Sequence, residues 1–241
     1  MLADLLAAPD KLLSLAPEEL AQFLLAELVA RGDKGDSQLL NRHNFFNWLH
    51  RELANGRIER GDQVMRSFAE AWSWLQNENL TVTEPSQGPE WVFVTERGRR
   101  AASPDGFASL NNSNLLPKGT LHPVLVQKVW PTFIRGDYDT TVFQAFREVE
   151  IAVRKAAGLS ATDIGVNLMR RAFGRGGALE DTAAPEAERD GLVALFSGAV
   201  ATYKNPQSHR DVNLGDPREA AEIVGFASQL LRIVDRRKAG P

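Results

Sequence analysis

The sequence has 241 residues, of which 43% are apolar, and this is enough for one large or two modest packed domains. Its formal charge of −3 argues against a generic nucleic-acid coat, because sequence-independent binding depends on many Lys and Arg side chains facing phosphates. The absence of Cys excludes disulfides and thiolate metal sites, and four His without an HExxH pattern argue against a zinc site. We therefore expect neither a metal nor another cofactor.

The chain shows no signal for export or membrane insertion. Residues 1–8 are apolar but short, lack a basic leader and contain Asp4, so they do not resemble a signal peptide. No apolar run approaches the ~18 residues that a membrane span needs. We therefore expect a cytoplasmic protein with no membrane partner.

The N-terminal part is predicted to hold three helices and a hairpin. The first helix is expected over residues 17–30, where Pro opens the run, two acids follow and a Gly comes after the end. The second is expected over residues 45–53, and the third over residues 62–78, where apolar residues recur at three- and four-residue steps. The β-prone runs LTVT and WVFVT, joined by EPSQGPE, predict a hairpin. This order resembles a winged helix-turn-helix, so residues 1–100 are predicted to form a winged-helix-like domain.

Three arginines directly after the hairpin are candidate nucleic-acid-binding residues, namely Arg97, Arg99 and Arg100. A helix that reads DNA presents several polar or basic side chains to the groove, whereas Arg66 is the only cation of the third predicted helix. Contact with a protein partner is therefore the favoured role of this domain, and DNA binding stays open as the alternative.

Residues 101–120 are rich in Gly, Ser, Asn and Pro and lack an apolar period, so they are predicted to be the linker between two domains. Charge also divides near this point. Residues 1–117 hold 11 basic and 16 acidic side chains, a net charge of −5, whereas the remainder holds 17 and 15, a net charge of +2. The C-terminal domain, residues 121–241, is thus the more plausible partner of an anion.

The C-terminal domain is predicted to be an up-and-down helical bundle of about four long helices, which makes the whole chain mainly α. The second of its expected helices places Glu150 and Arg154 as an i,i+4 pair away from its apolar face. Asp216 is the expected cap of the last helix. The helices are expected over residues 122–133, 142–158, 166–174, 187–203 and from Pro217 to about residue 234.

The segment LFSGAVATYKNPQSHRD, residues 195–211, joins the last two of these helices. Its helical run breaks at Asn205, because the following Pro pushes that residue out of the α region, and this leaves Lys204 and His209 beside a short polar turn. A cation and an imidazole can hold a phosphate and move a proton, as metal-free RNA cleavage requires. The same residues could equally form an ordinary turn between helices, and their spacing does not decide between the two.

The same segment, with VNLMRRAFG upstream, resembles the bacterial Ymh-type family within the HEPN group of helical proteins, over about residues 120–237. HEPN proteins are similar in placing Arg, a polar residue and His at the end of a bundle helix. In many of them this motif cleaves RNA without a metal, often as a toxin or an antiphage-defence effector. The resemblance implies that Lys204 matches the Arg, Asn205 the polar residue and His209 the His. Lys is a point charge where Arg offers a two-pronged grip on phosphate.

The resemblance also implies a homodimer through the C-terminal bundle, in which two copies of the motif face each other across one cleft. Phe143 or Phe146 and one face of the helix over residues 187–203 are the candidate contacts. The residues expected to support the motif are Glu150, Arg154, Tyr203 and Arg210.

The leading hypothesis is a metal-independent endoribonuclease that leaves a 2′,3′-cyclic phosphate and a 5′-OH. In it, His209 transfers protons, Lys204 neutralises charge on the phosphorane and Asn205 orients the His or the phosphate. The alternative is a non-catalytic HEPN-like module that binds RNA or nucleotide, or that serves as a dimeric scaffold. A third hypothesis is a DNA-binding regulator that uses the winged helix.

Overall fold

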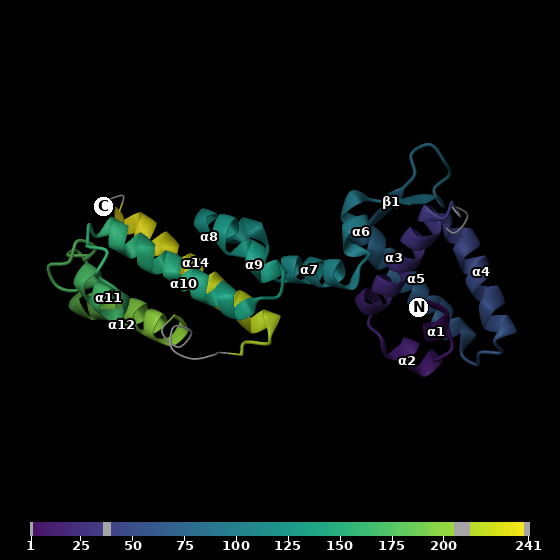
Figure 1. Ribbon diagram of the computed structural model, residues 1–241, viewed down its shortest axis with the longest axis horizontal. Coiled ribbons are helices and arrows are strands. Elements are labelled where there is room, and N and C mark those ends of the chain that lie inside the picture. Colours follow the sequence, from purple (N-terminus) through teal and green to yellow (C-terminus); the bar gives the residue numbers. More distant parts are fainter. Residues whose placement is uncertain (1, 36–39, 205–212, 239–241) are drawn as a thin grey trace. The chain divides into compact units, whose positions relative to one another are not determined.

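Helices that each carry one apolar face gather into two units, Met1–Ala108 and Ser109–Pro241. Figure 1 shows the computed structural model, which describes residues 2–35, 40–204 and 213–238. Helices dominate both units and a short antiparallel sheet lies in the first, which confirms the predicted mainly-α fold. Within the described ranges, no helix combines the length and the apolar character that a membrane crossing requires.

The first unit is built around the packing of its third helix against its fifth. Its elements are α1 (Leu2–Leu6), α2 (Pro9–Ser14), α3 (Pro17–Asp33), α4 (Arg42–Asn55), α5 (Gly61–Asn77), β1 (Thr81–Thr83), β2 (Val92–Val94) and α6 (Glu96–Ala101). The buried face of α5 consists of Val64, Phe68, Ala71, Trp72 and Leu75, as the three- and four-residue steps predict. Burial of these side chains against α3 stabilises the unit, because apolar area is removed from water.

The hairpin of this unit also contacts the start of α4. β1 pairs with β2 in antiparallel register, and Asn41 forms an isolated antiparallel bridge with Trp91. α4 begins at Arg42, three residues before the predicted start, because the Asn41 side chain caps the helix by accepting a hydrogen bond from Asn44 N (3.0 Å). The order of α3, α4, α5 and hairpin is the predicted winged-helix-like order.

Residues 101–120, predicted to be a linker, contain helix α7 (Pro104–Leu115) and a 3₁₀ turn at Lys118–Thr120. The boundary between the two units falls inside α7, after Ala108. Ser103 caps the helix by accepting from Gly106 N (3.1 Å), and Pro suits the first turn because it has no N–H to lose. Phe107 is buried at 3% exposure. The Ser-Pro pair is thus a helix start in a segment whose composition predicts a loop.

The second unit contains three long helices and several short ones. Its elements are α8 (Pro123–Lys128), α9 (Trp130–Ile134), α10 (Tyr138–Ala156), α11 (Gly165–Phe173), α12 (Glu186–Tyr203) and α14 (Pro217–Lys238). The helix predicted over residues 122–133 is broken at Val129, because Pro131 removes a backbone donor and its ring clashes with the preceding turn. Asp216 caps α14 as predicted, by accepting from Arg218 N (2.8 Å).

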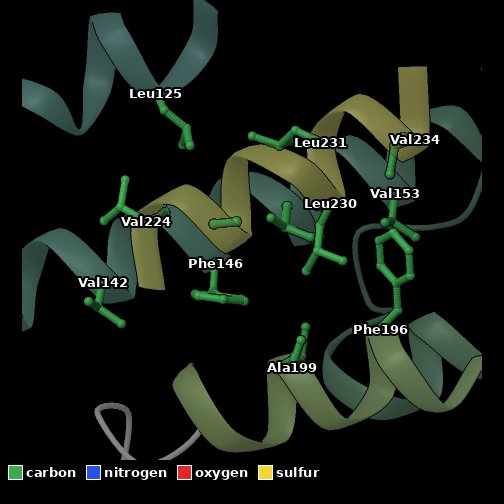
Figure 2. Packing of buried hydrophobic residues seen from close by; sticks show 14 of the residues in the cluster. Leu125, Val142, Phe146, Val153, Phe196, Ala199, Val224, Leu230, Leu231 and Val234 are labelled. Carbon is green, nitrogen blue, oxygen red and sulfur yellow. The ribbon is translucent and has the colours of Figure 1, made fainter. Parts of the chain in front are cut away.

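Side chains from α10, α12 and α14 meet in one shared interior, as Figure 2 shows. The ring of Phe146 on α10 stacks on Tyr203 of α12 at 5.1 Å, and Phe173 of α11 stacks on Phe196 at 4.2 Å between centroids. Phe146 has no exposed area, so its prediction as a contact between two copies of the chain is wrong. Phe143, one position past Val142 on α10, is half-buried.

We expect Phe146→Ala to lower the unfolding free energy of the second unit by about 3–5 kcal/mol, because it leaves a cavity and removes the ring under Tyr203. Urea unfolding followed by circular dichroism measures the change. Leu115→Ala, at a side chain that is 40% exposed, is the control and should change stability by no more than about 0.5 kcal/mol. Equal losses in the two variants would contradict the packing described here.

Candidate functional site

A buried carboxylate on α10 collects donors from three parts of the second unit. Glu150 is 4% exposed. Its Oε2 accepts from Lys204 Nζ at 2.9 Å and from Gly165 N at 2.9 Å. Its Oε1 accepts from Arg154 Nη2 at 2.7 Å. This carboxylate cluster, defined by Glu150, Arg154, Gly165 and Lys204, ties the end of α12 and the start of α11 to α10.

Local backbone geometry brings each donor to the carboxylate. Arg154 lies one helical turn after Glu150, at the spacing where side chains on α10 are neighbours. Lys204 directly follows the last residue of α12. Gly165 begins α11 with φ of +61°, a conformation that side-chain-bearing residues rarely adopt. The predicted pairing of Glu150 with Arg154 is confirmed, and both partners are largely buried instead of lying on the surface.

Burial alone would raise the pKa of Glu150, because it disfavours the charged form. Hydrogen bonds from Lys204 and Gly165 and the charges of Lys204 and Arg154 outweigh burial and hold this pKa below its ordinary value of 4.5. The carboxylate is therefore ionised at neutral pH. The positive charges of Lys204 and Arg154 therefore both lie against this one carboxylate.

The turn between α10 and α11 is fixed by the same arginine. Arg154 Nε donates to Asp163 O at 2.9 Å. The Asp163 carboxylate accepts from Ser160 N at 3.0 Å and forms an ion pair with Arg171 of α11. Arg154 thus connects the buried carboxylate to the turn that delivers Gly165.

The chain on both sides of residues 205–212 is tied to α10. On one side Lys204 binds Glu150, and on the other Leu214 N donates to Asp139 Oδ1 at 3.0 Å. The two anchoring carboxylates are eleven positions apart on α10, which corresponds to about 16 Å along a helix axis. The predicted site residues Asn205, His209 and Arg210 lie outside the described residues, between these two anchors.

Tyr203, predicted to support the motif, is a packing residue of the bundle. Its ring stacks on Phe146 and meets Phe226 of α14 edge-on at 6.3 Å. These contacts hold the last turn of α12 in place, and Lys204 follows directly.

The three arginines after the hairpin lie on α6, and two of them face carboxylates of their own unit. Arg97 Nη2 is 3.4 Å from Glu78 Oε2, and Arg99 Nη1 is 3.0 Å from Asp33 Oδ1. Arg100 is exposed. Pairing with acids reduces the positive field that a phosphate backbone would meet at α6. In the part of the chain that the structure describes, no group of three His, Asp or Glu side chains is arranged to hold a metal ion.

A comparison with known families identifies the second unit. Residues 119–234 match the family model described as "Protein of unknown function (Hypoth_ymh)". Residues 119–234 form a Ymh-type domain. This confirms the resemblance to the Ymh-type family, and the carboxylate cluster lies entirely within the Ymh-type domain. No curated protein and no solved structure matches the chain.

Glu150→Gln keeps the size of the side chain but removes the charge that Lys204 and Arg154 share. We expect it to lower the unfolding free energy at neutral pH by about 3 kcal/mol, because breaking a buried ion pair leaves charges uncompensated. The matched control is Glu148→Gln on the same helix, which pairs with Lys128, a side chain that is 55% exposed. The unfolding free energy should fall less in this variant than in Glu150→Gln.

The lowered pKa of Glu150 determines the direction in which the unfolding free energy changes with pH. Because the pKa of Glu150 is lower in the folded than in the unfolded state, its contribution is present above about pH 4.5 and is lost as pH falls through the folded pKa. Urea unfolding from neutral to acidic pH should therefore show a steeper loss for the unsubstituted protein than for Glu150→Gln. Parallel pH profiles would mean that Glu150 does not titrate with a lowered pKa.

Proposed function

We propose that the Ymh-type domain is a metal-independent endoribonuclease of the HEPN kind, acting in the cytoplasm as a toxin or antiphage-defence effector. The observation that carries this proposal is the carboxylate cluster, which fixes the Lys204 cation at the point where α12 leads into Asn205 and His209. A fixed cation next to an imidazole-bearing segment suits the binding of a phosphodiester.

In the proposed reaction, His209 removes the proton from a ribose 2′-OH, and the 2′-oxygen attacks the adjacent phosphorus. The bond from phosphorus to the 5′-oxygen then breaks, and the protonated His209 gives the proton that it removed to this leaving oxygen. The products are a 2′,3′-cyclic phosphate and a 5′-OH, so atoms and charges balance without water or a metal ion. Asn205 orients the imidazole or the phosphate.

Lys204 contributes positive charge from a held position. Its ammonium group donates to the Glu150 carboxylate, which holds it against α10. The lysine side chain is only 17% exposed, so its position is set by the bundle and not by solvent. A group that is positioned before the substrate arrives needs little rearrangement to stabilise charge on a phosphorane.

The outer face of α12 supports a homodimer in which two copies of the motif share one cleft. This face is exposed and built of small residues beside one leucine: Gly191, Ala194, Leu195, Gly198, Ala201 and Thr202. A Cβ added at Gly198 would meet no described atom within 4 Å. Small side chains let a second helix approach closely, and a two-fold axis would then bring both α12 ends to one cleft.

The second candidate function is a non-catalytic module that binds RNA or nucleotide, or that serves as a dimeric scaffold. The contact of Lys204 with Glu150 favours it, because a carboxylate at 2.9 Å competes with phosphate for the ammonium group. A lysine also lacks the planar, two-pronged grip that arginine offers a phosphate.

Incubation of the full chain with labelled single-stranded RNA in EDTA tests the catalytic proposal. We expect cleavage to 2′,3′-cyclic phosphate ends, and a loss of at least about 100-fold in His209→Ala, because general acid–base catalysis contributes that much. His50→Ala, at an exposed histidine of the first unit, should keep the full rate. Lys204→Arg should retain activity.

Two outcomes decide against the catalytic proposal. Cleavage that persists in His209→Ala would contradict the chemistry given above. Absence of cleavage in every condition, with RNA binding retained, would favour the non-catalytic module.

The dimer is tested by light scattering after size-exclusion chromatography. We expect Gly198→Arg to convert a dimer into a monomer and to abolish cleavage, because a long cation on the outer face of α12 prevents close approach. The matched control is Gly225→Arg, which places the same side chain at an exposed glycine of α14 that also has open space around it. A dimer that survives Gly198→Arg would place the interface elsewhere.

A further inference from the structure

The first unit has a hollow of about 530 Å³ between α4 and α5, outside the Ymh-type domain. Three apolar side chains form its floor, and charged or polar side chains form its rim. The floor consists of Phe46, Met65 and Ala69, and the rim of Arg42, His43, Arg66 and Glu90.

The floor is an apolar surface that the fold supports but does not cover. Phe46, Met65 and Ala69 are each only half-buried, although the neighbouring core positions of α5 are fully buried. Phe46 packs edge-on against Phe45 at 5.3 Å and lies 6.2 Å from the Trp72 ring, so the floor is backed by the aromatic core. Such a surface binds apolar groups with little rearrangement.

The rim is positively charged within a part of the chain that is acidic as a whole. Arg42 lies over the Phe46 ring at 5.5 Å, and Arg66 projects from α5 on the other side. Among the described residues, neither guanidinium forms an ion pair, in contrast to Arg97 and Arg99 of α6. Glu90 is the one acid of the rim, and its carbonyl oxygen accepts from Arg42 N at 2.7 Å. Carboxylates therefore complement this rim.

The shape of the hollow favours a segment of polypeptide over other occupants. Every lining residue is at least partly exposed, whereas pockets for small ligands bury most of the ligand. The apolar groups that duplex DNA presents in its major groove are small thymine methyls, which fill the floor poorly, and the exposed face of α5 carries Asp62 and Glu70 one turn on either side of Arg66. These acids repel a long row of phosphates more than the few carboxylates of a short peptide segment.

We propose that the hollow binds a short acidic segment of a partner protein, with one bulky apolar side chain seated on Phe46, Met65 and Ala69. Carboxylates that flank this side chain pair with Arg42 and Arg66. An apolar anchor within a charged rim gives affinity through burial and selectivity through charge. This site is independent of the ribonuclease proposed for the Ymh-type domain.

Fluorescence anisotropy with the full chain tests the site. The probe is a fluorescein-labelled peptide with a Leu-Phe pair flanked by Asp on both sides, compared with the same peptide carrying Asn for Asp or Ala for Leu and Phe. We expect the acidic apolar peptide to bind at least about tenfold more tightly than either comparison peptide. The double variant Arg42→Glu with Arg66→Glu should weaken binding by a similar factor.

The control double variant is Arg51→Glu with Arg100→Glu, which makes the same change in charge at two exposed arginines outside the hollow. It should bind the peptide as the unsubstituted protein does, and circular dichroism checks that both variants fold. An equal loss of peptide binding in the two double variants would mean that overall charge, and not the hollow, determines the affinity. That result would refute the site.

A second experiment does not depend on one probe sequence. Peptides are selected from a random library displayed on phage, and those that also bind the Arg42→Glu, Arg66→Glu variant are removed. Enrichment of Asp or Glu around Phe, Leu or Trp would support the proposal. Selected peptides without this pattern, or no binding by either the library or the probe, would refute it. Binding of a labelled DNA duplex that is lost in the same double variant would assign the hollow to DNA.

Discussion

The second unit depends on one buried carboxylate. Glu150 has almost no contact with water, and an unpaired charge in that position would cost several kcal/mol. The fold avoids this cost by directing one lysine, one arginine and one backbone N–H at it. Because these donors come from the end of α12, from α10 itself and from the start of α11, satisfying one charge fixes three helices relative to each other. The end of α12 is consequently one of the most constrained points of the bundle.

This constraint shapes the proposed active site. Catalysis by fixed charge requires that the cation be in place before substrate binds. Apolar stacking of Tyr203 on Phe146 holds the last turn of α12, and Glu150 holds the lysine that follows. The same helix exposes small residues on its opposite side, and this is the face on which we propose that a second copy of the chain packs. In the first unit, the hollow between α4 and α5 is a separate surface with its own charge pattern.

Apolar periodicity was enough to predict most helices, because a buried face repeats every three or four residues whatever it packs against. Periodicity could not reveal that Pro131 divides one expected helix, nor that Ser103 starts another in a loop-like segment. The pairing of Glu150 with Arg154 followed from spacing within one helix. Its burial did not, since Lys204 reaches Glu150 only after 54 positions of intervening chain have folded back.

Long-range partners limited the prediction of the candidate sites in the same way. Arg99 looked like a phosphate contact in a basic triplet, but Asp33 lies 66 positions earlier and faces it only in the folded unit. The hollow had no signal in the sequence, because Met65 and Ala69 lie one ridge beside the buried face of α5 and periodicity assigns them to neither core nor solvent. The residues on each face of a helix were predictable from the sequence. The residues from distant parts of the chain that contact them were not.

The backbone conformation of Gly165 and its hydrogen bond to Glu150 restrict how this part of the sequence can vary in evolution. Its φ of +61° excludes most side chains on conformational grounds, and its N–H is committed to the Glu150 carboxylate. A chain with an apolar residue in place of Glu150 would leave this N–H without its carboxylate acceptor. Across related sequences the acid and the glycine, fifteen positions apart, should be gained and lost together with a cation after α12. A covarying triplet of this kind marks the cluster in sequences whose structures are unknown.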